Sequence, residues 1–228
     1  IMMKNNDKTL VKVISSFYFI IALYEILAYS IFNETLVFST ISIPVLLIAL
    51  YFFASVKRNL LFLSILIFLL IESVWTLFYD SRFSVGIICS SIQKIALIIL
   101  IFKLIKERNY MYLSIVSLAF LLIFLYLFST TSETSYVDFK FLMLQNILTS
   151  VLGGIAVSSY MIDDNRKNSW LLISILLFIG LRFMLFIQSF YLTDLTLPVI
   201  KPIIITLNIF AYFTLYKFVI EAEKNEIE

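Results

Sequence analysis

Long apolar runs constrain this chain more than any other feature of its sequence. Eight segments of about 20 mostly apolar residues follow one another, separated by short charged or turn-forming stretches. Continuous runs of this length are typical of transmembrane helices, whereas the strands of membrane barrels are shorter and alternate. The expected spans are 13–31, 41–56, 60–79, 83–102, 110–128, 141–161, 170–191 and 199–220.

The composition supports a membrane protein. Hydrophobic residues make up 62% of the 228 residues and charged residues 14%, and the mean hydropathy is +1.04. A soluble domain of this size could not cover such a core with polar surface. We therefore predict an all-α fold, an eight-transmembrane-helix bundle that forms a single integral membrane domain over 1–228, in the cell (inner) membrane.

The basic residues of the connections predict the orientation. The connections on one side of the membrane carry twelve basic residues, and those on the other side carry three. The larger set is Lys4, Lys8, Lys12, Lys57, Arg58, Lys103, Lys106, Arg108, Arg166, Lys167, Lys217 and Lys224; the smaller is Arg82, Lys140 and Lys201. Because cytoplasmic loops of membrane proteins are enriched in Lys and Arg, we expect both termini in the cytoplasm. An even number of spans requires the same.

Several kinds of chemistry are excluded by what the chain lacks. It contains no histidine and one cysteine, Cys89. Ser-His-Asp and Cys-His catalysis and HExxH zinc sites are therefore absent, and we expect neither a metal nor a cofactor. The basic residues are dispersed and the net charge is +2, so no nucleic-acid partner is expected.

Four charged residues fall inside the expected spans: Glu25, Glu72, Lys94 and Arg182. A charge at the bilayer centre costs about 2.5–3.5 kcal/mol on insertion scales, so we expect these side chains to face the interior of the bundle and to pair. The two acids and the arginine lie ~18 Å from the cytoplasmic ends of their helices, and the lysine ~12 Å. Two interpretations stay open, a buried ion-pair network that fixes helix orientation and a polar site for a ligand or for chemistry.

Polar neighbours extend this candidate site. A desolvated glutamate can act as general acid or base, so the candidate catalytic residues are Glu72, Glu25 and Ser73, which follows Glu72. The candidate ligand-binding residues are Lys94, Arg182, Gln145, Asn146, Asn208 and Tyr212. In the sixth span a stripe of Gln145, Asn146, Thr149, Ser150 and Gly153 is typical of close helix packing, or else forms one wall of a polar cavity.

Three segments carry a resemblance to a known family. They are Ser42–Tyr51 at the opening of the second span, Leu70–Trp75 with Phe83 and Gly86 after it, and Phe178–Phe190 followed by Pro198. Together with the eight-span layout they resemble the YhhN-like lysoplasmalogenase family, whose members hydrolyse the vinyl-ether bond of lysoplasmalogens. In this register the family's two acidic positions fall at Ser73, beside Glu72, and at Arg182, and its histidine falls near Lys94.

The resemblance implies a hydrolase of single-chain ether lipids that uses a buried polar cavity. Two alternatives stay open on the same residues. One is a non-catalytic relative that binds a membrane lipid or a membrane protein partner. The other is a small transporter or proton relay, which ranks third because the spans lack the Gly/Pro interruptions typical of transporters.

Overall fold

The computed structural model describes residues 5–32, 37–78, 83–105, 109–129, 136–190 and 199–225. Within these ranges the chain is helical apart from short connections, and it forms eight α-helices. They are α1 (Asn5–Phe32), α2 (Val37–Ala54), α3 (Leu60–Phe78), α4 (Phe83–Leu104), α5 (Tyr110–Ser129), α6 (Tyr136–Ile162), α7 (Arg166–Phe190) and α8 (Ile200–Asn225).

Each helix coincides with one predicted apolar segment, so the all-helical prediction is confirmed for the described residues. Several helices are longer than predicted. α1 begins at Asn5 rather than Val13 and α7 at Arg166 rather than Trp170, because hydropathy detects only the apolar part of a helix. Five residues used for the topology and the resemblance lie outside the described ranges: Lys4, Arg82, Lys106, Arg108 and Pro198.

Asparagine side chains cap three helices at one end of the bundle. Asn59 Oδ1 accepts a backbone N–H at the start of α3 at 3.0 Å, and Asn109 Oδ1 accepts one at the start of α5 at 3.0 Å. Asn165 Oδ1 does the same for α7 at 2.8 Å. The first N–H groups of a helix have no partner within the helix, so an asparagine immediately before an apolar run fixes where that helix begins.

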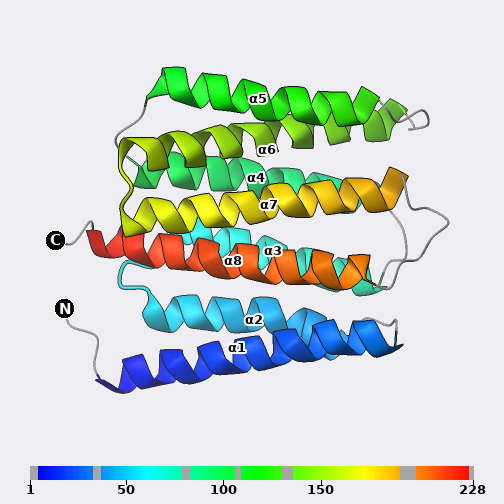
Figure 1. The fold of residues 1–228 in the computed structure, drawn as a ribbon. Helices are drawn as coiled ribbons and strands as arrows, with labels where there is room; N and C mark the ends of the chain where they lie inside the picture. The colour runs from blue at the N-terminus through cyan, green and yellow to red at the C-terminus, as the bar shows by residue number, and fades with distance from the viewer. Residues whose placement is uncertain are drawn as a thin grey trace.

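The helices run along a common direction and alternate in sense (Figure 1). We name the end at which α1 begins and α8 ends the basal end, and the opposite end the distal end. From α1 to α4, each helix packs against the next one in the chain. Further contacts join α4 to α6, α6 to α7, α7 to α8, and α8 to α1. These contacts form a closed ring of seven helices, and α5 lies outside it against α6.

Glycines in α6 let α5 approach closely. A Cβ atom built on Gly154 would lie 1.9 Å from Ser117 Oγ and 2.7 Å from the Leu113 carbonyl oxygen, both on α5. A Cβ on Gly153 would lie 2.7 Å from the ring of Phe120. Small residues are the usual means of close helix contact in membranes. This half of the sixth-span stripe therefore serves packing, as one of the two interpretations predicts.

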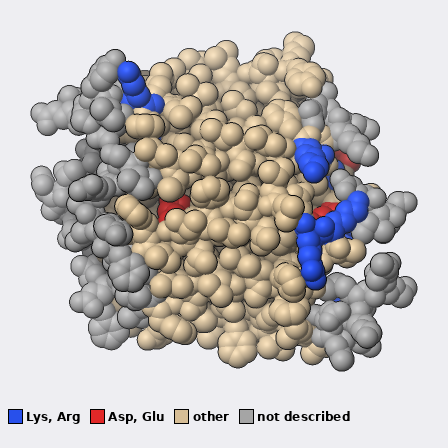
Figure 2. All heavy atoms as spheres, turned by 180° about the vertical axis from the view of Figure 1, so that it is seen from behind, with Lys and Arg blue, Asp and Glu red and all other residues tan. Residues whose placement is uncertain are grey.

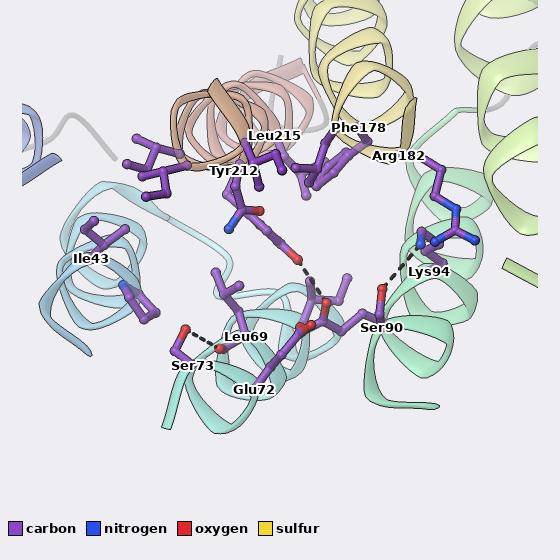
Figure 3. A pocket seen from close by; sticks show the side chains of 18 of the residues that line it. Ile43, Leu69, Glu72, Ser73, Ser90, Lys94, Phe178, Arg182, Tyr212 and Leu215 are labelled. Atoms are coloured by element: carbon purple, nitrogen blue, oxygen red, sulfur yellow. Dashed lines mark hydrogen bonds between the residues drawn. The ribbon is translucent and has the colours of Figure 1, made fainter. Parts of the chain in front are cut away.

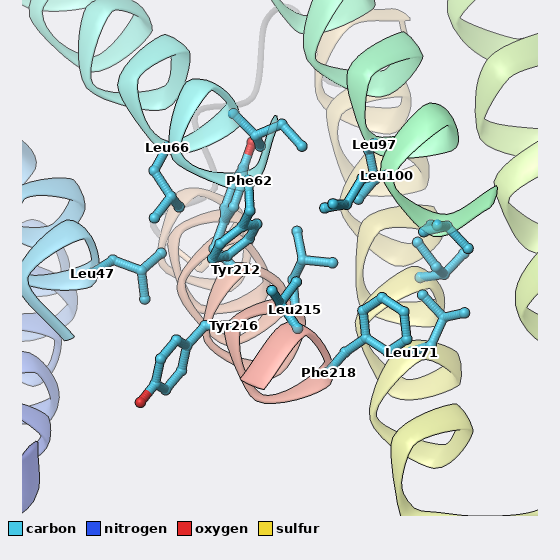
Figure 4. Packing of buried hydrophobic residues seen from close by; sticks show 14 of the residues in the cluster. Leu47, Phe62, Leu66, Leu97, Leu100, Leu171, Tyr212, Leu215, Tyr216 and Phe218 are labelled. Atoms are coloured by element: carbon cyan, nitrogen blue, oxygen red, sulfur yellow. The ribbon is translucent and has the colours of Figure 1, made fainter. Parts of the chain in front are cut away.

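The basal half of the ring is filled with apolar side chains (Figure 4). Phe62, Leu100, Leu171 and Phe218 come from four different helices and are fully buried. Tight packing of this kind leaves few voids larger than a water molecule. Among the described residues the interior is therefore densely packed toward the basal end.

The outer surface is apolar. Five described helical segments are long and apolar enough to cross a membrane, namely Lys8–Ile31, Tyr110–Ser129, Lys140–Ile162, Arg166–Gln188 and Ile200–Asn225. Figure 2 shows one face as a broad band with few charged side chains, with most of the visible Lys and Arg at the basal end, on the right of this view. Many large apolar side chains of the described helices are exposed. A soluble protein would not expose so wide a band of large apolar side chains. The fold is that of a helical membrane protein.

Candidate functional site

A cavity of about 580 Å³ occupies the distal half of the ring. All seven ring helices contribute to its lining, and no described residue of α5 does. Leu47 and Leu215 form its floor and belong also to the packed core below. The volume lies within the range of about 300–1,000 Å³ typical of small-molecule sites.

The lining is apolar on much of its surface and carries a concentrated set of polar groups. The polar residues are Tyr18, Glu25, Thr40, Glu72, Ser73, Ser90, Gln93, Lys94, Gln145, Thr149, Arg182, Lys201, Asn208 and Tyr212. Ile, Leu and Phe side chains make up most of the remaining wall. All four charged residues predicted at membrane depth therefore face one interior cavity rather than lipid.

Glu25 lies on the α1–α2 side of the cavity. It is 6% exposed, and the Thr40 hydroxyl of α2 donates to its Oε1 at 3.1 Å. Tyr18, two turns earlier on α1, donates its own hydroxyl to the Ile209 carbonyl at 2.9 Å. That hydrogen bond fixes α8 against α1 and directs the tyrosine proton away from Glu25.

Glu72 extends from α3 toward α4 and α8 (Figure 3). Beside it, Tyr212 of α8 donates its hydroxyl to Gln93 Oε1 at 2.9 Å, which links α8 to α4 across the cavity. Gln93 is 5% exposed, and its Nε2 atom has no hydrogen-bond partner among the described residues. The Gln93 amide lies beside the Glu72 carboxyl group, the acid of this side of the cavity.

Ser73 lines the cavity, but its hydroxyl donates to the Leu69 carbonyl of its own helix at 2.9 Å. A serine nucleophile requires a base that receives its proton. In the observed geometry the proton points to a backbone carbonyl. Ser73 therefore needs a rotamer change before Glu72 can activate it, and its catalytic role stays a prediction.

Lys94 and Arg182 face the cavity from α4 and α7 (Figure 3). Lys94 Nζ donates to Ser90 Oγ at 3.3 Å, one turn earlier on α4. Arg182 is 9% exposed and donates through Nε to Asn146 Oδ1 of α6 at 3.1 Å. Lys94 lies within electrostatic range of both Arg182 and Glu72.

The expected ion pairs are not formed. Within the described ranges, no two of the four cavity charges approach within the 4.0 Å of a salt bridge. The prediction of pairing was wrong because neutral groups take the role of partner: a threonine for Glu25, a serine for Lys94 and an asparagine for Arg182. A sequence shows the depth of each charge but not the direction in which its helix turns it.

The other predicted ligand-binding residues divide into two groups. Gln145, Asn208 and Tyr212 line the cavity directly. Asn146 lies behind the lining, 2% exposed, and holds Arg182. The sixth-span stripe thus serves both predicted roles, with Gln145 and Thr149 on the cavity and the glycines on α5.

Six polar lining residues were not singled out as site residues from the sequence: Tyr18, Thr40, Ser90, Gln93, Thr149 and Lys201. Gln93 precedes Lys94, and an amide inside an apolar span is itself a signal of an interior polar site. Lys201 lies at the distal end, where its Nζ is 5.1 Å from the centroid of the Tyr29 ring. Thr40 carries no such signal, because threonine is common in membrane helices.

The described residues contain no group of three or more His, Cys, Asp or Glu side chains close enough to hold a metal ion. Glu25 and Glu72 are the two carboxylates of the lining. The chemistry that the cavity supplies is thus that of two carboxylates, two ammonium groups, one guanidinium and several amides and hydroxyls.

Comparisons with family models, curated proteins and solved structures found no match. The fold and the cavity define the class: a helical membrane protein with a polar cavity inside its helix ring.

Proposed function

We propose that the chain is a multi-pass protein of the cell (inner) membrane with eight spans, oriented with its basal end and both termini in the cytoplasm. The distribution of basic residues supports this orientation. The described basal end carries Lys8, Lys12, Lys57, Arg58, Lys103, Arg166, Lys167, Lys217 and Lys224, whereas the distal end carries Lys140 and Lys201. Positive charge is retained on the cytoplasmic side of membrane proteins.

In this orientation the cavity binds a single-chain lipid and acts on its ether bond. One observation carries the proposal: a single cavity within the helix ring combines apolar walls with a cluster of charged and amide side chains. An amphiphile presents the same combination, a chain that gains from leaving water and a head that needs polar partners. A volume of about 580 Å³ suits one chain and a compact head rather than a two-chain phospholipid.

Glu72 is the residue best placed to act as the acid. In its protonated form it would donate its proton to the vinyl-ether carbon remote from oxygen. Water would add to the resulting oxocarbenium ion and return a proton to the Glu72 carboxylate. The hemiacetal would then break its carbon–oxygen bond to give a fatty aldehyde and the free glycerol hydroxyl. Stabilisation of such charge by fixed dipoles is strongest in a dry cavity, and the Gln93 amide beside Glu72 is such a dipole.

The test is aldehyde release from lysoplasmalogen by protein purified in detergent, measured by mass spectrometry. We expect release by the wild type and a loss of at least ~100-fold in Glu72→Gln, the range typical of removing a general acid. Glu221→Gln is the matched control, because that glutamate lies outside the cavity lining near the basal end. Release equal to that of a protein-free blank would contradict hydrolysis, as would a fully active Glu72→Gln.

A second candidate is a non-catalytic relative that binds the lipid. Two observations favour it: Arg182 occupies a position that the resemblance assigns to an acid, and the Ser73 hydroxyl is directed to its own backbone. Under this candidate a single-chain lipid co-purifies with the protein and survives incubation intact. The aldehyde assay separates the two candidates directly.

A further inference from the structure

Two cations share one wall of the cavity. Lys94 of α4 and Arg182 of α7 point into the same region (Figure 3), and each lies within electrostatic range of the other. Neither has a carboxylate within salt-bridge distance in the described part of the chain. A pair of like charges inside a bundle is unfavourable unless a negative group compensates it, and the membrane interior screens the repulsion poorly.

The acids of the cavity do not supply that compensation in full. Glu72 is within electrostatic range of Lys94. Glu25 is held on α1 by Thr40 of α2. Around the pair the protein thus places two positive charges against one negative charge.

Both cations also keep unused donors. Arg182 donates a hydrogen bond through Nε to Asn146. Its two terminal amino groups donate to none of the side chains that the structure describes. Lys94 donates to Ser90, which leaves two of its three protons. Asn146 of α6 thus holds the guanidinium through Nε, and Arg182 remains one of the residues that line the cavity.

We propose that Lys94 and Arg182 form an oxyanion subsite that takes the phosphate group of a single-chain lipid. The guanidinium fork binds two oxygens of such a group, and the ammonium group binds a third as a point charge. Phe178 and Leu215 line the same cavity and provide apolar surface for the chain. This inference rests on the proposed binding of a single-chain lipid and specifies the head group that the site selects.

The test compares ligands of one chain length on the wild-type protein. Purified protein in a neutral detergent is titrated with lysophosphatidic acid, with the corresponding monoacylglycerol and with inorganic phosphate, and thermal stabilisation or native mass spectrometry reports binding. We expect the phosphate lipid to bind about tenfold or more tightly than the monoacylglycerol, one charge-assisted hydrogen bond being sufficient for such a factor. We expect inorganic phosphate to bind much more weakly than the lipid.

Variants then assign the selectivity to the two cations. Arg182→Gln and Lys94→Met should each reduce the preference for the phosphate lipid about tenfold while retaining monoacylglycerol binding. Arg166→Gln on α7 and Lys103→Met on α4 are matched controls, since both residues are exposed at the basal end. These two should bind as the wild type does.

The outcomes separate this inference from the proposed function. Equal binding of both lipids by the wild type would overturn the phosphate subsite and leave lipid binding intact. No binding of either lipid would overturn both proposals. Inorganic phosphate that binds as tightly as the lipid would show that the chain is not part of the ligand. The binding measurements on the wild-type protein decide each of these outcomes. The inference can therefore be refuted even if a variant fails to fold.

Discussion

Tyr51→Phe provides a sharp test of how the basal end is held together. Tyr51 is 1% exposed at the end of α2 and donates its hydroxyl to Glu223 Oε1 of α8 at 2.7 Å. The Tyr51 hydroxyl oxygen also accepts the backbone N–H of Asn59 at 2.5 Å, where α3 begins. Glu223 is 3% exposed and accepts a second hydroxyl, that of Ser55, at 2.7 Å. One phenol oxygen therefore links the start of α3, the end of α2 and the end of α8.

The size of the effect follows from the bonds removed. A hydrogen bond to a charged group contributes about 1.5–3 kcal/mol, and an unpaired buried N–H costs about 1–3 kcal/mol. The ring itself stays, so no cavity term is added. Allowing for partial hydration of both groups, we expect a loss of about 2–4 kcal/mol in the free energy of unfolding, from the same hydrogen-bond values. At about 2–4 °C per kcal/mol for a chain of this size, the melting temperature should fall by about 4–16 °C.

The assay is thermal unfolding in detergent, followed by intrinsic fluorescence. Tyr126→Phe is the matched control, because Tyr126 is 70% exposed on α5 and its loss should not change the melting temperature. A Tyr51→Phe variant that melts within about 1 °C of the wild type would refute the idea that these hydrogen bonds stabilise the basal end, since that shift corresponds to well under 1 kcal/mol.

Three further predictions concern α5, the arginine support and the orientation. Gly154→Ala should lower the melting temperature by about 2–12 °C, for an overpacking cost of about 1–3 kcal/mol, whereas Gly86→Ala, with nothing within 4 Å of its new Cβ, should not lower it. Asn146→Leu should destabilise the protein, and in a double-mutant cycle with Arg182→Met the two losses should fall short of additivity by about 1 kcal/mol or more, as measured by thermal or chemical unfolding. A cysteine replacing Lys140 should react with an impermeant maleimide added outside intact cells, relative to the parent chain; labelling only after lysis would contradict the orientation.

The positions of the helices could be predicted because each lies on an uninterrupted apolar run. α3 begins at Leu60 and α5 at Tyr110, as predicted, since in both cases an asparagine cap precedes the run directly. The start of α1 was missed because Asn5 and the polar residues after it continue a helix without any apolar signal. That Glu25, Glu72, Lys94 and Arg182 face the interior was also predictable, because a charge inside an apolar span is costly to expose to lipid.

Partners could not be predicted, since they depend on how each helix is rotated and on which helices are neighbours. Glu25 binds a threonine of the next helix and Arg182 an asparagine 36 residues earlier. Tyr51 and Glu223 are 172 residues apart, and Glu223 lies beyond the last predicted span. The contact between α2 and α8 brings this last pair together, and neither segment carries a local signal of it.

The packed basal half has a consequence for traffic through the molecule. Leu100, Phe62 and Phe218 are fully buried below the cavity floor at Leu215, so among the described residues the core closes the cavity toward the basal end. A ligand bound as we propose would therefore enter and leave the cavity from its distal side. Transport of a ligand across the bundle would require these core side chains to move apart. The fold thus favours a binding or catalytic role for the cavity over a role as a channel.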